Sequence, residues 1–197
     1  MRGGGTIQWS MKTNILITTI TAALLTFTAA PAIFAEDAVK TEATAKDATA
    51  DARFMEVATR DSLSEIKAAE IAQDKTKREE VKSFAASIAK DHKDVNKNLK
   101  SLADRMKMEL PKDVGDHQAF LDGLKAKTDA DFDRTYVAAT VASHKKCVAL
   151  FEAFSKATKN EDLRAFADNT LPGLRIHLKH STDLLETLGG TNGVPTL

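Results

Sequence analysis

Five polar residues interrupt apolar helical stripes in this sequence, and their types suit a metal ion. His92, His144 and His177 each take a core-type position in a different amphipathic segment. A fourth segment contributes Asp61 and Glu65, which lie four residues apart and so share one helix face. Histidines on facing helices, with a carboxylate nearby, are how helical bundles build metal sites. Imidazole suits Zn, Cu or Fe, so the sequence predicts a site for one such transition-metal ion.

The spacing of these residues along the chain supports a common level in a bundle. His144 precedes the last interhelical link by about as many residues as His177 follows it, so a rise of about 1.5 Å per residue puts both rings at nearly the same height. On helix one, Asp61 is closer to the level of His92 than Glu65, which lies about 6 Å lower. Asp61 is therefore the better placed carboxylate, and Glu65 has the longer reach.

The same three histidines also fit a second interpretation, a buried hydrogen-bonded network that fixes the register of the helices. Di-iron bundles carry Glu-x-x-His motifs, but the residues three before these histidines are Ala89, Val141 and Leu174, which disfavours di-iron chemistry. The sequence contains no nucleophile elbow, phosphate loop, CxxC or HExxH motif. The sequence therefore contains candidate metal ligands but no motif that indicates a catalytic reaction.

The elements that position these residues follow from hydrophobic periodicity. Apolar residues recur at three- and four-residue steps from Ala52 onward, a spacing typical of amphipathic helices. We expect long helices over residues 52–73, 77–108, 131–158 and 161–188.

The links between these segments predict the topology. The first and third links are short, which makes the helices they join antiparallel neighbours. The middle connection, residues 109–130, is long and contains a short helical stretch near residues 116–127. We therefore predict an all-α, ferritin-like four-helix bundle with a long middle connection carrying a short helix. This domain spans residues 52–190, and a tail of residues 191–197 follows the glycine pair that ends helix four.

The N-terminus is typical of an export signal. Lys12 precedes an apolar run over residues 15–30, and small residues follow. We predict a signal peptide over residues 1–35 with cleavage after Ala35, or alternatively after Ala32. Residues 36–51 are rich in Ala, Thr, Lys and Asp and are interpreted as a disordered linker. Any membrane contact would come only from this N-terminal segment, if it stays uncleaved.

Charge and cysteine content narrow the function further. The chain has 28 Lys and Arg against 28 Asp and Glu and shows no basic stripe, so we expect no nucleic-acid partner. Its one cysteine, Cys147, lies in an apolar helical pattern and is interpreted as a buried small hydrophobe.

Several segments resemble the bacterial domain-of-unknown-function family 4142. They read EVKSFAASIAKDHKDVNKNLKSLA, LPKD, DFDRTYVAATVASHKKCVALFEAF and LRAFADNTLPGLRIHLKHSTDLL, and the resemblance spans residues 54–188. Members are exported, ferritin-like helical proteins, often labelled outer membrane proteins. The resemblance places these residues in the family pattern: Glu65, Asp91, His92, Asn96, Asp133, Tyr136, His144, Pro172 and His177. Asp61 and Ser62 stand where the family usually has glycines.

These observations predict an exported cell-envelope protein that is a non-catalytic binding or stress-related module. The alternative is a periplasmic metal-binding protein with a His-rich site in the bundle core. The partners expected from these two interpretations are an envelope protein and a metal ion, respectively.

Overall fold

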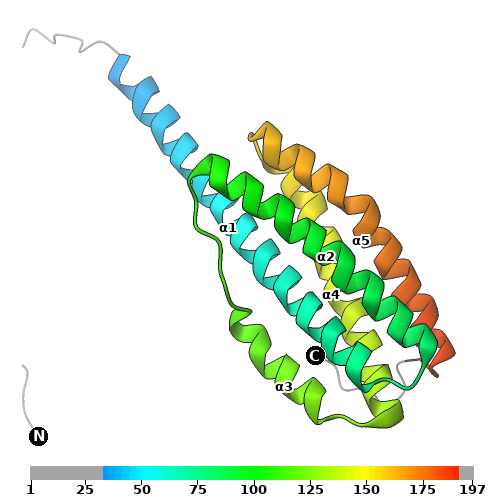
Figure 1. Cartoon of the computed structure of the whole chain (residues 1–197). Helices are drawn as coiled ribbons and strands as arrows, with labels where there is room; N and C mark the ends of the chain where they lie inside the picture. The colour runs from blue at the N-terminus through cyan, green and yellow to red at the C-terminus, as the bar shows by residue number, and fades with distance from the viewer. Residues whose placement is uncertain (1–32, 191–197) are drawn as a thin grey trace, which may run out of the picture.

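Four long helices run side by side in the computed structural model, which describes residues 33–190 (Figure 1). They are α1 (Ile33–Lys75), α2 (Glu79–Met106), α4 (Asp129–Ala157) and α5 (Glu161–Thr187). Within residues 33–190 there is no strand, so the expected all-α class is confirmed. None of these described helices is long and apolar enough to cross a membrane.

The connection between α2 and α4 sets the topology. It runs back along the length of the bundle and carries a 3-10 turn (Gly115–His117) and the short helix α3 (Gln118–Ala126), which packs against α1 and α4 (Figure 1). α1 contacts α2 and α4, and α5 contacts α4 and α2, so α2 and α4 stand at opposite corners of a square. Because of the long crossing these two helices run in the same direction, which is the ferritin-like topology.

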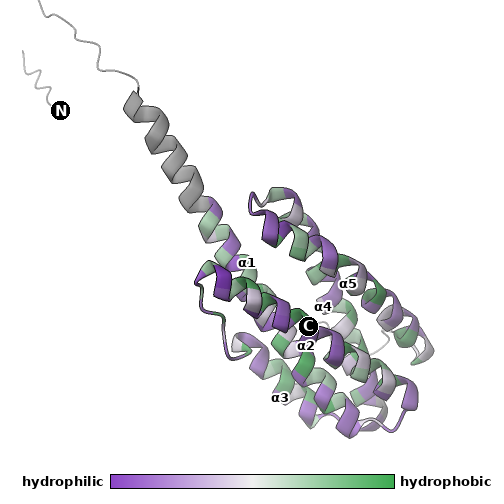
Figure 2. Cartoon of the chain, turned by 45° about the horizontal axis from the view of Figure 1, so that its top comes forward, coloured by the Kyte–Doolittle hydropathy of each residue, from purple (hydrophilic) through white to green (hydrophobic). Residues whose placement is uncertain are grey.

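The apolar core is divided into two clusters. One, at the end where α3 lies, includes Phe84, Phe132 and Tyr136. The other, at the opposite end, includes Phe54 and Phe154, whose rings stack with centroids 3.7 Å apart. The predicted histidines occur between the two clusters along α2, α4 and α5. Figure 2 shows hydrophobic and hydrophilic residues alternating along each of these helices. Two apolar layers of the core therefore enclose one polar layer, which contains the three histidines.

The segment 36–51 differs from the expected disordered linker, because α1 continues through it from Ile33. Two contacts hold its last turn against the link between α4 and α5. The Thr158 hydroxyl donates to Asp51 at 2.9 Å, and Lys159 pairs with Asp47 at 2.8 Å. The alanines, glutamates and lysines of this segment also favour helix once an anchor is present.

Other expected boundaries shift by a few residues or lie outside the described range. α2 ends at Met106, two residues early, because Lys107 adopts a left-handed conformation (φ 55°) and its N–H caps the helix. Gly189 (φ 93°) and Gly190 (φ 67°) end α5 as predicted, since such angles favour glycine. The predicted signal peptide (1–35) and tail (191–197) fall almost wholly outside residues 33–190.

Replacing Phe54 with Ala tests the packing of the second apolar cluster, which lies at the end of the bundle opposite α3. The ring is 3% exposed and packs against Phe151, Phe154 and Phe166, so the truncation leaves a cavity. We expect the free energy of unfolding to fall by about 3–5 kcal/mol in urea denaturation followed by circular dichroism. A loss below about 1 kcal/mol would contradict this packing.

Candidate metal centre

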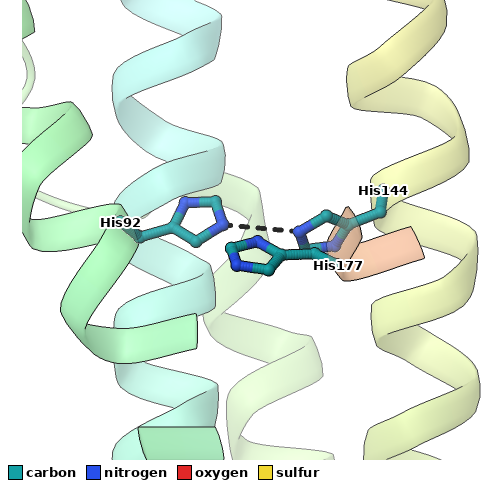
Figure 3. Close-up of side chains that lie close together, drawn as sticks. All are labelled: His92, His144 and His177. Carbon is teal, nitrogen blue, oxygen red and sulfur yellow. Dashed lines mark hydrogen bonds between the residues drawn. The ribbon is translucent and has the colours of Figure 1, made fainter. Parts of the chain in front are cut away.

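Three imidazoles from three helices meet in the polar layer between the two apolar clusters. His92 of α2, His144 of α4 and His177 of α5 are buried, with exposed fractions of 4%, 0% and 7%. One ring nitrogen from each lies within 4.8 Å of the other two, and His92 Nε2 is 3.5 Å from His144 Nε2. Figure 3 shows the three rings turned toward one another. The fold therefore has the level predicted for His144 and His177, and His92 lies at that level too.

The outer nitrogen of His92 is fixed by a serine of α1. His92 Nδ1 lies 3.2 Å from Ser62 Oγ, and that hydroxyl donates its only proton to the His92 backbone carbonyl at 3.1 Å. Ser62 Oγ must therefore accept from Nδ1–H. We assign the proton of neutral His92 to Nδ1, which leaves the lone pair of Nε2 facing the centre.

His144 is fixed by its own helix. Its Nδ1 lies 3.1 Å from the carbonyl oxygen of Thr140, one turn earlier in α4, and a carbonyl only accepts. Nδ1 therefore carries the proton. Glu65 Oε1 lies 3.7 Å from the same nitrogen, on the side away from the centre. A carboxylate there increases the basicity of an imidazole that binds a metal through its other nitrogen.

His177 is fixed by a carboxylate of α2. Its Nε2 donates to Asp91 Oδ2 at 3.0 Å, which leaves the lone pair on Nδ1. Nδ1 is buried and has no hydrogen-bond partner among the described residues. Buried polar atoms are almost always paired, so this nitrogen requires a ligand or a water.

The three proton assignments leave an unprotonated nitrogen on each ring, namely His92 Nε2, His144 Nε2 and His177 Nδ1. These are called the inner nitrogens, and each carries a free lone pair. Two lone pairs at 3.5 Å repel each other, and no proton of the neutral rings lies between them. Protonation would relieve the repulsion, but burial makes a charged ring costly. Burial, and then the neighbouring histidines, lower the pKa of His92 to about 3, and burial lowers the pKa of His144 to about 4. Burial also lowers the pKa of His177, so the rings stay neutral near neutral pH and suit a cation other than a proton.

The two predicted carboxylates do not join the three nitrogens. Glu65 stands behind His144, and burial raises its pKa to about 7. Asp61 faces the crossing connection instead, where its Oδ1 accepts from His117 Nε2 at 2.9 Å and its Oδ2 from the Cys147 thiol at 3.9 Å. Burial raises the pKa of Asp61 too. The structure thus groups the histidines and leaves both acids outside the group.

Three hydrogen-bond partners of the candidate site residues could not be predicted from the sequence. Ser62, the Thr140 carbonyl and the His117 contact to Asp61 carry no motif of their own. The His117 contact crosses 56 residues and depends on where the middle connection lies. Asp91 has a sequence signal, because it adjoins His92, yet its partner is His177 on another helix.

Residues 36–184 match the family described as domain of unknown function DUF4142. The chain belongs to the DUF4142 family. No curated protein matches it.

Solved structures share the fold of this DUF4142 protein. A DUF305 protein from Streptomyces coelicolor, described as secreted, superposes with a TM-score of 0.62 and 17% identity, over 72% of this chain and 94% of that one. A DUF305 fragment from Deinococcus radiodurans gives 0.64 and 12%, over 70% and 96%. CopM in its Cu(I)-bound form gives 0.61 and 21%, over 71% and 98%. At these identities the likeness establishes the helical-bundle fold.

The neutral histidines predict that the metal-free protein loses stability as the pH falls. Unfolded histidines gain protons below about pH 6.5. Folded His92 and His144 do not until about pH 3 and about pH 4, so the unfolded state binds two more protons in that window. Folded Glu65 takes up one proton below about pH 7, which offsets one of the two. The free energy of unfolding should therefore decrease by about 1 kcal/mol per pH unit between about pH 6 and about pH 5.

Urea unfolding at these pH values measures the slope. A His144→Gln variant removes one of the two histidines with a strongly lowered pKa. Its free energy of unfolding should therefore change less steeply with pH than that of wild type. A wild-type stability that stays flat or increases as the pH falls through this window would contradict the assignment of neutral, buried rings.

Proposed function

We propose that this protein binds one Cu(I) ion in its core through His92 Nε2, His144 Nε2 and His177 Nδ1. The observation that carries the proposal is the convergence of three bare imidazole nitrogens, one of them buried without any partner. Ligands about 2.0 Å from a metal lie about 3.3–3.5 Å from one another. The His92–His144 pair is already at 3.5 Å. The His177 nitrogen lies within 4.8 Å of both, so this ring has to move closer when the ion binds.

The donor set favours Cu(I). Three neutral imidazoles without a carboxylate or thiolate suit copper or zinc and not magnesium or calcium. Because the desolvation cost of an ion increases steeply with its charge, a buried site of neutral ligands favours a monovalent cation. CopM, which has the same fold, has solved structures in Cu(I)-, Cu(II)- and Ag-bound forms, and this supports copper as the ion here.

Binding is a better description than catalysis for this site. The three rings are at most 7% exposed, so an ion among them is enclosed by the core, whereas a catalytic metal keeps a position open to substrate. Together with the predicted signal peptide, this supports a periplasmic or cell-envelope protein that sequesters or carries copper.

The interpretation of the histidines as a structural network has less support. A network that only stabilises the fold would satisfy its members, but His177 Nδ1 has no hydrogen-bond partner among the described residues. In the assigned tautomers, no proton lies between His92 Nε2 and His144 Nε2 either. A protein-binding surface also has little support, because among the described residues Ile176, 66% exposed, is the one large apolar side chain that is strongly exposed.

Titration with Cu(I) tests the proposal, with two histidines of α5 as a matched pair. Wild type should bind one equivalent, and Cu(I) at 100 times the dissociation constant should add about 2.7 kcal/mol of stability. His177→Gln removes a ligand and should weaken binding by at least about 100-fold, beyond the loss typical of an outer partner. His180→Gln, an exposed position three residues on, should bind as wild type does.

Circular dichroism confirms that each variant is folded before titration. Full Cu(I) binding by a folded His177→Gln protein would overturn the ligand assignment. A wild type that binds no Cu(I) and gains no stability from it would overturn the proposed function and favour the structural network.

A further inference from the structure

A surface cleft between α2 and α5 leads to the proposed copper site. It has a volume of about 500 Å³, and His92 and His177 both line it. His144, 0% exposed, does not line it. A cavity on the other side of the bundle, between α1 and α4, has about 180 Å³ and reaches none of the three histidines. The α2–α5 cleft therefore borders two of the three ligands, whose side chains are themselves buried.

His177 connects the interior to this cleft. Its Nε2 is bonded to Asp91, whose side chain is 47% exposed and lines the cleft, while its buried Nδ1 has no partner. A single ring thus joins a solvent-exposed carboxylate to the centre. A carboxylate attracts an incoming cation electrostatically, and Asp91 is the acid placed beside a ligand.

The charges around the cleft favour entry of a cation. Asp91, Asp94 and Asp162 line it. Facing them, Lys90 contacts Asp91 and Asp94 at 3.4 and 3.7 Å, and Arg105 pairs with Asp162 at 3.1 Å. Three carboxylates against these two cations leave one net negative charge, although Arg105 also lines the cleft, and a net negative charge raises the local concentration of cations.

Gly173 is a lining residue of the cleft that carries no side chain. It lies inside α5, lines the cleft and is exposed, and a Cβ added there would meet no atom within 4 Å. Glycine within a helix costs about 1 kcal/mol relative to alanine. The residue thus leaves open a space that most side chains would fill.

Resting on the proposed function, we infer that the α2–α5 cleft is the passage by which Cu(I) enters and leaves the core, with Asp91 as the first ligand it meets. The ion binds the Asp91 carboxylate, His177 is released from its hydrogen bond, and the ion passes to His177 and His92 and then to His144. Gly173 belongs to the passage and not to the binding site. The rate of exchange and the equilibrium affinity are therefore separable by mutation.

Gly173→Phe tests the passage, because it narrows the cleft without altering a ligand. Protein loaded with Cu(I) is mixed with an excess of a chromogenic Cu(I) chelator, and the first-order rate of release is followed by absorbance. Competition with the same chelator at equilibrium gives the dissociation constant. The control is Gly123→Phe in α3, another glycine with open space around it and no part in the cleft.

We expect Gly173→Phe to release Cu(I) at least about tenfold more slowly, with the dissociation constant unchanged, because obstruction slows entry and exit alike. Gly123→Phe should match wild type in both. Equal release rates for Gly173→Phe and wild type would overturn the passage while leaving Cu(I) binding intact. Absence of binding in wild type would overturn the proposed function, and the passage with it. If Gly173→Phe does not fold, Gly173→Leu provides the same comparison.

Discussion

The hydrogen bond on the outer nitrogen of each histidine is the constraint on which the centre depends. Ser62, the Thr140 carbonyl and Asp91 each accept a proton from one ring, and each thereby fixes which nitrogen is bare. Without these acceptors the rings could donate to one another and satisfy themselves. With them, three lone pairs point at a common space, and only a cation or an added proton relieves the repulsion.

The apolar core around the histidines favours a metal ion over an added proton. Apolar clusters above and below the histidines remove water from the layer, and burial is the main cause of the lowered pKa values of His92 and His144. A proton is therefore held poorly near neutral pH, while a metal ion gains three ligand bonds at once. The ferritin-like crossing makes this arrangement possible, because it brings α2 and α4 to opposite corners with their histidines at one level.

Sequence periodicity predicted the four helices and the common level of His144 and His177, because both follow from a fixed rise per residue. It could not predict that His92 lies at the same level, because that depends on the long connection between the two hairpins. It could not predict the partners across helices. Asp91 bonds to His177 and not to its neighbour His92, and Asp61 turns to His117, because these contacts depend on how the long connection aligns one hairpin with the other. The contacts of the helical segment before residue 52 could not be predicted from the sequence, because its partners, Thr158 and Lys159, are more than 100 residues away.

X-ray absorption spectroscopy of the Cu(I)-loaded protein tests the central claim most directly, because it reports the atoms bound to the ion. The three bare imidazole nitrogens predict three nitrogen ligands with the imidazole scattering pattern and no sulfur. A spectrum with a sulfur ligand, from Cys147 or a methionine, or with fewer than two imidazoles, would contradict the account and place the ion elsewhere.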